Sequence, residues 1–432
     1  MAENKQQGNL VAIIMMIILF GMISFVTNLA APMGIVLKAQ FNLSNFMGIL
    51  GNAANFIAYA VMGIPSGILL QKIGYKKTAL VAVAVGFIGV GIQLLSGYAG
   101  NSAFGVYLTG ALVAGFSMCL LNVVVNPMLN TLGGGGNKGN QLIQVGGSFN
   151  SVMATVTPMV VGMLIGEISK DTNIRDIFPF MYTAMAVFAV VFVVLAFVKI
   201  PEPNAETTSE PLGQLISGAL KFRHFVLGAI GIFVYVGVEV GTPGIMNYFL
   251  VDINLPNPLN PTTAGFVAGT YWFLMLIGRL VGASIGGKVS SKTMLTVTSF
   301  VGIILVLLAM FLPTSKEVAL PVLKSVEGVT SFGLLNVPIN AAFLVLVGLC
   351  TSIMWGSIFN LAVEGLGKYL AAASGIFMVL VCGGGILPAL QGWIADVAGY
   401  LPSYWVVVAG LAYLFFYATV GSKNVNTDIP TK

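Results

Sequence analysis

Long apolar stretches of similar length recur along the whole chain, and short polar segments separate them. About 20 apolar residues are the length that crosses the hydrocarbon core of a bilayer as a helix. The apolar runs are continuous rather than alternating, which favours helices over the strands of a membrane barrel. The pattern predicts twelve spans, at about residues 10–38, 47–72, 77–98, 103–132, 140–166, 177–199, 225–251, 263–288, 292–312, 336–362, 369–394 and 400–421. The segment 313–335 is mixed and charged, and we expect a loop with some helix there.

The basic residues are distributed unevenly over the predicted loops. With the N-terminus in the cytoplasm, thirteen lysines and arginines fall on the cytoplasmic side, whereas the outer side holds only Lys38, Lys170, Arg175, Lys316 and Lys324. Short loops rich in lysine and arginine stay in the cytoplasm. We therefore expect both termini in the cytoplasm, an even number of spans, and a multi-pass protein of a bacterial inner (plasma) membrane.

The longest clearly polar segment, residues 200–224, divides the predicted spans into six and six. Its mixture of Pro, Ser, Thr and Glu is typical of a linker. The chain also repeats weakly at an offset of 215 residues, where Gly67, Lys77, Thr78 and Leu80 match Gly282, Lys292, Thr293 and Leu295. We therefore expect an all-α membrane protein of two pseudo-symmetric halves: an N-terminal six-helix half at 1–199, a cytoplasmic linker at 200–224 and a C-terminal six-helix half at 225–432.

Composition excludes several classes of protein. Of the 432 residues, 57% are hydrophobic and only 8% are charged, whereas soluble domains carry about 25% charged residues. The net charge of +5 belongs to the cytoplasmic loops, so we expect no nucleic-acid partner. Cys119, Cys350 and Cys382 lie inside predicted spans without a CxxC pair, which argues against a disulfide framework and a zinc site. Without a histidine cluster, paired mid-span acids or a Ser/Lys pair, we expect neither an enzyme nor a cofactor.

Short motifs at particular places carry a family resemblance. Residues Gly67–Lys77, between spans two and three, resemble the loop signature of the major facilitator superfamily, with two glycines followed by basic residues. Gln71 stands where that signature has an aspartate. Within the superfamily, the chain resembles the fucose permease and glucose/galactose transporter family along nearly its whole length, through the strings Phe41–Phe46, Ile64–Leu69, Asn126–Pro127, Ser148–Ser151, Tyr235–Glu239, Ile277–Arg279 and Gly383–Ile386.

The resemblance implies the major facilitator fold and the import of a monosaccharide, driven by a proton or sodium gradient. The fucose permease branch has one acid in span one and another in span four, and the matching residues here are Ala31 and Asn122. Fucose–proton symport is therefore not transferred to this chain. Glu239 matches an acid of the glucose/galactose branch, so the resemblance implies a sugar and leaves the coupling ion open between Na⁺ and H⁺.

Glu239 is the one acid near the middle of a predicted span, and Arg279 is the one intramembrane base. A charge at that depth costs about 2.5–3.5 kcal/mol on insertion scales, so such residues usually face the bundle interior or a cavity. Two interpretations stay open. Glu239 either couples an ion or accepts a hydrogen bond from a sugar hydroxyl, or it is a structural partner of Arg279. A salt bridge that opens when an ion binds would combine them.

Neutral polar residues in the predicted spans form a second set of candidates. Sugars are uncharged and rich in hydroxyls, so their binding takes amides that donate and accept, together with an aromatic face. Asn122 and Asn126 lie four residues apart on one helix face, and Trp355 lies in mid-span. Hydrogen bonding between helices, as part of their packing, is the structural alternative. The candidate substrate-binding residues are Asn28, Asn122, Asn126, Ser148, Asn150, Asn247, Trp272, Trp355 and Asn360.

The sequence thus predicts a secondary transporter that imports a hexose or a related sugar by alternating access, as a functional monomer in the lipid bilayer. An uncoupled sugar uniporter and an exporter of drugs or other small solutes are the alternatives, and the 28 phenylalanines and 20 methionines fit such an exporter. A non-transporting sensor would need a signalling domain, for which the 25-residue linker leaves no room.

Overall fold

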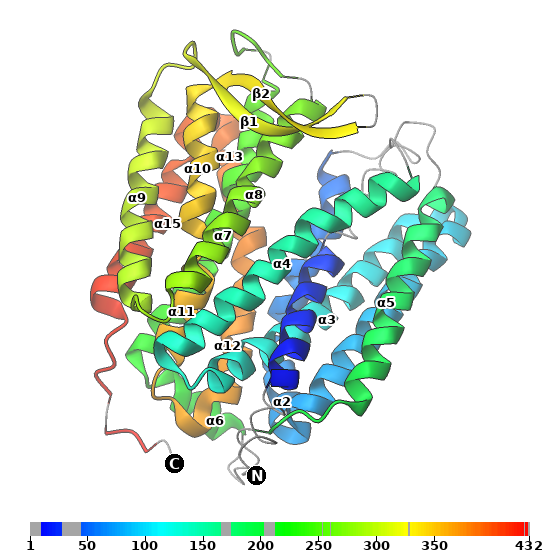
Figure 1. Ribbon diagram of the computed structural model, residues 1–432, viewed down its shortest axis with the longest axis vertical. Helices are drawn as coiled ribbons and strands as arrows, with labels where there is room; N and C mark the ends of the chain where they lie inside the picture. The colour runs from blue at the N-terminus through cyan, green and yellow to red at the C-terminus, as the bar shows by residue number, and fades with distance from the viewer. Residues whose placement is uncertain are drawn as a thin grey trace.

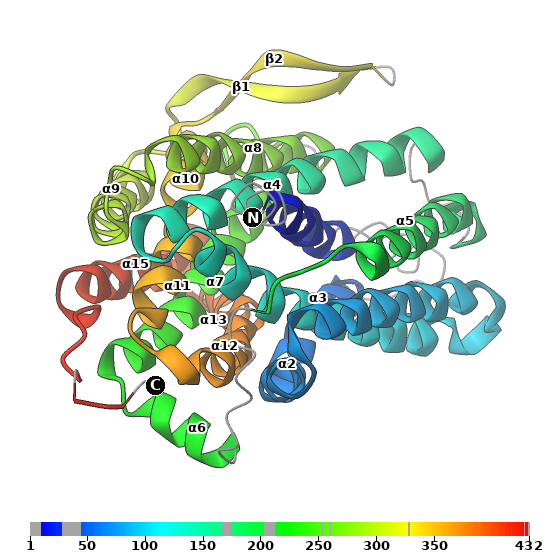
Figure 2. The ribbon, with the colours of Figure 1, turned by 60° about the horizontal axis from the view of Figure 1, so that its bottom comes forward.

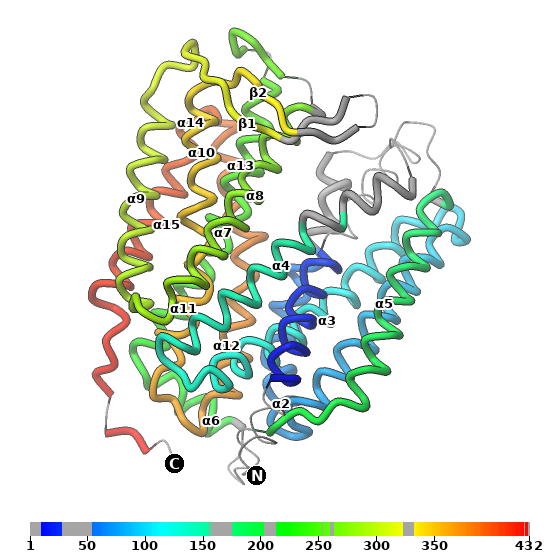
Figure 3. Tube along the Cα trace, in the orientation of Figure 1, coloured from blue at the N-terminus to red at the C-terminus, as the bar shows by residue number. Residues whose placement is uncertain are grey.

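Long helices, most of them roughly aligned, make up the protein in the computed structural model (Figures 1 and 3). The structure describes residues 10–27, 45–165, 174–202, 212–252, 254–259, 261–326, 329–426 and 428–430. The first helix begins at Leu10 and the last ends at Gly421, both at the lower end of the bundle in Figure 1. We call this the terminal end and the opposite one the distal end.

The first part of the chain forms a group of helices that pack against one another, which we call the N-terminal helices. The group starts with the helix Leu10–Thr27. It continues with α2 (Asn45–Leu95), η1 (Ser96–Tyr98), η2 (Gly100–Ser102), α3 (Ala103–Leu132), α4 (Gly136–Ile165), η3 (Ile174–Ile177) and α5 (Phe178–Phe197).

The second part forms the C-terminal helices, preceded by the short helix α6 (Leu212–Leu220) in the predicted linker. Several of its membrane-spanning segments are made of two shorter helices in succession, such as α10 with α11 and α12 with α13. The elements are α7 (Arg223–Leu250), α8 (Pro261–Ile285), α9 (Ser291–Phe311), β1 (Glu317–Val326), β2 (Val329–Pro338), α10 (Ile339–Thr351), α11 (Met354–Val363), η4 (Gly367–Tyr369), α12 (Leu370–Val379), η5 (Leu380–Cys382), α13 (Gly383–Ala398), α14 (Tyr400–Ser403), α15 (Trp405–Phe416) and η6 (Tyr417–Gly421).

The helices correspond to the twelve predicted spans. Within the described residues, ten helical segments are long and apolar enough to cross a membrane. One of them, Ala54–Tyr98, covers the second and third predicted spans, and α4 supplies the fifth. Apolar residues on all sides of these helices explain the arrangement, because some face neighbouring helices and the others face lipid.

The segment 313–335 is mainly a β-hairpin, so the expectation of a loop with some helix was wrong. Strands β1 and β2 pair in antiparallel register from Glu317–Pro338 at the base to Val326–Val329 at the tip. Alternate apolar residues cause this structure, because β-branched side chains on one face pack against helices. Val322 on β1 and Val337 on β2 are buried in this way, and β1 contacts α8 and α10.

A sharp turn at Gly74 joins the two spans inside α2. Gly74 has a φ of 80°, a conformation that glycine adopts without steric cost. The backbone N–H groups of Tyr75 and Lys76 donate to the Glu202 carboxylate, at 2.7 and 3.0 Å. A carboxylate from the start of the linker therefore holds this turn, in a loop where Gln71 replaces the aspartate of the superfamily signature.

The N-terminal and C-terminal helices meet where α2 crosses α12 and where α4 crosses α8. At the first crossing the backbones are very close. A Cβ added at Gly375 would lie 2.8 Å from the Gly63 carbonyl oxygen and 3.1 Å from the Gly67 Cα. Small residues are what permit such an approach between membrane helices.

Replacing Gly375 by valine should force α2 and α12 apart. Overpacking of this kind costs about 1–3 kcal/mol, so we expect a lower Tm of the purified protein in detergent. Gly105→Val is the matched control, because a Cβ at that helical glycine meets no atom within 4 Å. Equal losses of Tm in the two variants would contradict a specific contact at Gly375.

Candidate functional site

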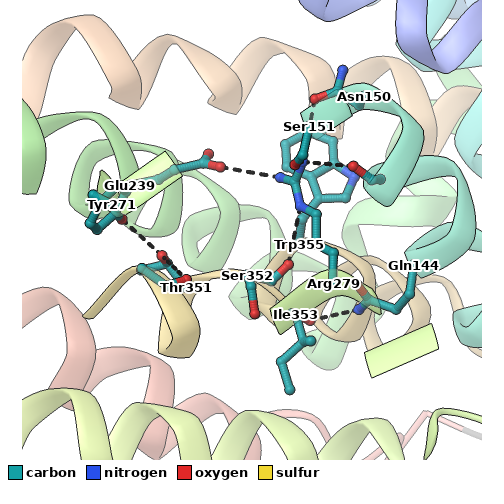
Figure 4. Close-up of polar contacts among 12 residues, drawn as sticks. Gln144, Asn150, Ser151, Glu239, Tyr271, Arg279, Thr351, Ser352, Ile353 and Trp355 are labelled. Carbon is teal, nitrogen blue, oxygen red and sulfur yellow. Dashed lines mark hydrogen bonds and ion pairs between the residues drawn. The ribbon is translucent and has the colours of Figure 1, made fainter. Parts of the chain in front are cut away.

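Arg279 on α8 reaches across to α4, so it joins the C-terminal to the N-terminal helices (Figure 4). Its Nη1 donates to the Gly147 carbonyl at 2.9 Å, to Ser151 Oγ at 2.7 Å and to Asn150 Oδ1 at 3.3 Å. Charged donors form stronger hydrogen bonds than neutral ones, especially away from water. This one side chain is therefore a substantial part of the contact between α8 and α4.

The same guanidinium pairs with Glu239 of α7, with Nη2 at 3.4 Å from Oε1. The two side chains are 10% and 14% exposed, so both charges are largely removed from water. Such a pair offsets its desolvation only when further hydrogen bonds satisfy the charges. The donations to α4 and one from Arg279 Nε to the Ser352 carbonyl, at 3.3 Å, meet that condition for the guanidinium. The structure thus brings together the two charged residues singled out in the sequence.

A second connection between the two groups of helices consists of neutral side chains. Asn122 Nδ2 donates to Tyr59 Oη at 2.6 Å, and Asn126 Nδ2 donates to Asn122 Oδ1 at 3.1 Å. Trp355 Nε1 then donates to Asn126 Oδ1 at 2.9 Å. The α-helical spacing of four residues stacks the two amides along α3, which makes this chain possible. Because the chain runs from α2 through α3 to α11, it crosses between the N-terminal and C-terminal helices.

The charged pair and the amide–indole chain are neighbours. Trp355 lies one turn beyond Ser352, whose carbonyl accepts from Arg279. The indole also lies 6.2 Å from the ring of Tyr235, which precedes Glu239 by one turn of α7. On its other side the indole meets Phe377 edge-on, at 6.2 Å between centroids. One site therefore contains an acid, a base, amides and an aromatic wall.

Towards the distal end, the face of α8 that carries Arg279 loses its contacts. Trp272, two turns away on this face, is 36% exposed. A Cβ added at Gly269 or Gly265, further along it, would meet no atom of the described residues within 4 Å. Figure 1 shows α4 and α8 diverging in the same direction. The charged pair thus lies where the two groups of helices begin to separate.

At the terminal end, hydrogen bonds join the two groups of helices. Asn130 Nδ2 donates to Asn360 Oδ1 at 2.8 Å, and Asn360 Nδ2 donates to Ser291 Oγ at 2.9 Å. Gln144 Nε2 donates to the Ile353 carbonyl at 2.9 Å (Figure 4). Asn360 therefore lies in a contact between the helix groups, and its partner Asn130 follows Asn126 by one turn of α3.

The remaining candidates are scattered. Ser148 is buried, and its hydroxyl donates to the Gln144 carbonyl of its own helix. Asn247 is half-buried on the distal part of α7, and the Trp272 ring packs edge-on against Tyr271 at 5.3 Å. Asn28 lies outside the described residues.

Sequence reasoning missed Tyr59, Tyr235, Ser151 and Asn130 as members of these networks. Asn130 continues the four-residue spacing of Asn122 and Asn126, and that signal was available. The tyrosines carry no comparable signal, because aromatic residues are abundant in all spans. Within the described residues, no group of three His, Cys, Asp or Glu side chains lies close enough to hold a metal ion.

Known proteins resemble this chain in sequence and in fold. The "Glucose/galactose transporter" of Brucella abortus is 29% identical over 429 residues, covering 98% of this chain and 97% of the relative. The "L-fucose-proton symporter" of Escherichia coli is 22% identical, covering 90% and 87%. A crystal structure of the E. coli fucose:proton symporter matches with a TM-score of 0.77 at 18% identity, over 96% of this chain and 100% of that one.

The match to the family model is as extensive. The model of the Major Facilitator Superfamily matches residues 13–389, which is most of the chain. The predicted all-α fold of this superfamily is confirmed, and so is the expectation of a transporter rather than an enzyme. The chain belongs to the major facilitator superfamily, and it is a multi-pass membrane transporter.

Proposed function

We propose that this protein imports a monosaccharide, a hexose or a related sugar, and couples the import to an ion gradient. The observation that carries the proposal is the amide–indole chain from Tyr59 to Trp355 beside the Glu239–Arg279 pair. Neutral amides and an indole suit a sugar, and the acid suits a coupling ion. Both lie where the N-terminal and C-terminal helices meet, which is where transporters of two repeated halves bind their cargo.

The names of the relatives support the same substrate class. The relatives from Brucella abortus and Escherichia coli are named for glucose, galactose and L-fucose, and the latter for protons as well. We therefore take the proton as the first candidate for the coupling ion and Na⁺ as the second. The transporter acts as a monomer in a bacterial inner membrane, with both termini in the cytoplasm.

Transport follows from movement of the two halves, residues 1–199 and 225–432, about the central site. In the present arrangement the contacts around Asn360 close the terminal end, while a Cβ at Gly265 or Gly269 on the distal part of α8 would meet no atom of the described residues. A proton on Glu239 would remove its charge attraction to Arg279, and a sodium ion would compete with Arg279 for the carboxylate. Either event weakens the bond between α7 and α8 that helps to hold the Arg279 guanidinium in place against α4, so ion binding favours a change of conformation.

Within the proposed site, the residues of the amide–indole chain have different roles. Asn126 is completely buried and donates and accepts within the chain, so it positions the Trp355 indole. Trp355 is half-buried and offers its ring to the apolar side of a sugar. Asn122, which is 5% exposed, and Tyr59 supply polar atoms for the hydroxyls.

Uptake by purified protein in proteoliposomes tests the proposal. Radiolabelled glucose, galactose, mannose, fructose, fucose and N-acetylglucosamine would be supplied in turn, with an imposed proton gradient, an imposed sodium gradient or none. We expect one sugar or a few related sugars to accumulate with one of the two gradients. Uptake that is the same with either gradient as with none would indicate a uniporter. No uptake of any sugar would refute the substrate class.

Replacing Trp355 by phenylalanine should weaken sugar binding. The substitution keeps an aromatic ring but removes the donor to the buried Asn126 Oδ1. The lost hydrogen bond, worth about 1–3 kcal/mol, no longer holds the ring where it would meet the sugar, so we expect KM for uptake to rise by roughly 5- to 150-fold. Trp405→Phe, at a 53% exposed position in the last span, is the matched control. An unchanged KM in Trp355→Phe would show that the indole does not contribute to sugar binding.

A further inference from the structure

Both faces of the hairpin β1–β2 carry large apolar side chains, and the exposed Asn336, the cross-strand partner of Ala319, is a polar residue near the base of its outer face. One face, which includes the buried Val322 and Val337, packs on the helices. On the other face Phe332 is 62% exposed and Leu334 is 65% exposed, and Pro321, the cross-strand partner of Leu334, is exposed too. A hairpin with one face in water normally carries polar residues there. The exposed face of this hairpin therefore does not have the composition of a water-facing surface.

The hairpin lies against the outer side of α8, near the distal end. In Figure 2 it runs along the edge of the molecule beside α8 and α10, and Figure 1 places it at the distal end. The ring of Phe332 is 5.6 Å from the ring of Phe273, which lies within α8. The exposed face of the hairpin thus reaches a residue of a membrane-spanning helix.

Phe273 belongs to the side of α8 that faces lipid. Ile277, Leu280 and Val281 follow it at helical spacing and are 37%, 51% and 52% exposed. The other sides of α8 are occupied, since Arg279 points to α4 and Gly278 abuts Ser352 of its own group. An exposed apolar stripe on a helix that crosses the membrane is in contact with acyl chains.

We propose that the exposed face of the hairpin, formed by Ala319, Pro321, Phe332 and Leu334, lies in the interfacial region of the distal leaflet of the bilayer. Three observations support phospholipid as the molecule that covers this face. The face continues the lipid-facing stripe of α8 through the Phe332–Phe273 contact. It lies at one end of the spans, where the headgroup region begins. Residues 318–323 and 329–336 of the hairpin contain no charged residue, as an apolar surface in the acyl-chain boundary requires.

The expected consequence is a fixed position of the hairpin relative to the membrane. Burial of apolar surface in the interface ties β1 and β2 to the distal leaflet and to α8. The loop between α9 and α10 then acts as a membrane anchor at the side of the C-terminal helices, where α8 and α4 diverge.

Spin labels on the full-length protein in phosphatidylethanolamine/phosphatidylglycerol vesicles test this position. A nitroxide would be attached at Leu334→Cys and, separately, at Pro321→Cys, and unsubstituted protein would serve as the blank for the native cysteines. Power-saturation measurements compare access of oxygen, which concentrates in lipid, with access of a water-soluble nickel chelate. Two reference sites bracket the result: Val281→Cys on the lipid-facing stripe of α8, and the exposed Asn101→Cys in η2.

We expect both hairpin labels to resemble Val281→Cys, with oxygen access several-fold higher relative to nickel than at Asn101→Cys. Ratios equal to that of Asn101→Cys would place the face in water and overturn the proposal. Dipolar broadening between labels on different molecules, lost when labelled protein is diluted with unlabelled protein, would show that a second copy covers the face and would also overturn it. A Tm equal to that of the unsubstituted protein, measured for each cysteine variant, ensures that the labels report on the folded protein.

Discussion

Replacing Glu239 by glutamine should abolish accumulation of sugar against its gradient, while exchange of sugar between the two sides continues. Glutamine has nearly the same shape and can still accept from Arg279, but it can neither carry a proton nor hold a cation by charge. We expect ion-driven uptake to fall at least about tenfold, to a level that an uncoupled carrier would give. Proteoliposomes loaded with unlabelled sugar measure the exchange, and an imposed gradient measures the accumulation.

Glu364→Gln is the matched control for this prediction. Glu364 is an exposed acid at the C-terminal end of α11, in the same half of the protein, and only its backbone carbonyl has a described hydrogen bond, to His224. Its replacement should leave both assays unchanged. If Glu239→Gln still accumulates sugar with the gradient, Glu239 is a structural partner of Arg279 and another group couples the ion.

Replacing Arg279 by methionine should cost more stability than any other single change at the site. The substitution removes the hydrogen bonds to α4 and leaves the Glu239 carboxylate buried without its partner. Breaking a buried pair from one side costs about 3–5 kcal/mol. We therefore expect a clear fall in the Tm of the purified protein, and transport reduced to background.

A double-mutant cycle separates the charge effect from the packing effect. In the Arg279→Met background, Glu239→Gln removes the unpaired charge and should restore part of the lost Tm. The restoration should be incomplete, because the bonds to Gly147 and Ser151 stay absent. Strictly additive losses of Tm would show that the two side chains do not interact strongly.

The spans could be predicted because each is a long apolar segment, and hydropathy alone defines it. The hairpin could not, because the charges in it and beside it, such as Glu317 and Lys316, and its short length resemble those of a loop. Its strands form only where alternate residues find α8 and α10 to pack against. The division of single spans into successive helices, as at α10 and α11, also depends on neighbouring helices and leaves no simple trace in the sequence.

The charged residues of the site were predictable because an acid and a base are rare inside spans. The two residues are 40 positions apart, on α7 and α8. Their contact could be expected because helices that follow each other in the chain usually pack together. The bond between Trp355 and Asn126 joins residues 229 positions apart, and only the packing of the two helix groups creates it. Interfaces of this kind cannot be inferred from the spacing of residues in one chain.

The carboxylate of Glu202 fastens one end of the linker to the N-terminal helices, and α6 fastens the other end to α12 and η4. Nine residues, 203–211, connect these two attachment points. A fully extended chain of that length reaches roughly 30 Å. We therefore expect this length to limit how widely the terminal end can open, so that shortening the connection would restrict exit of the cargo at that end without touching the proposed site.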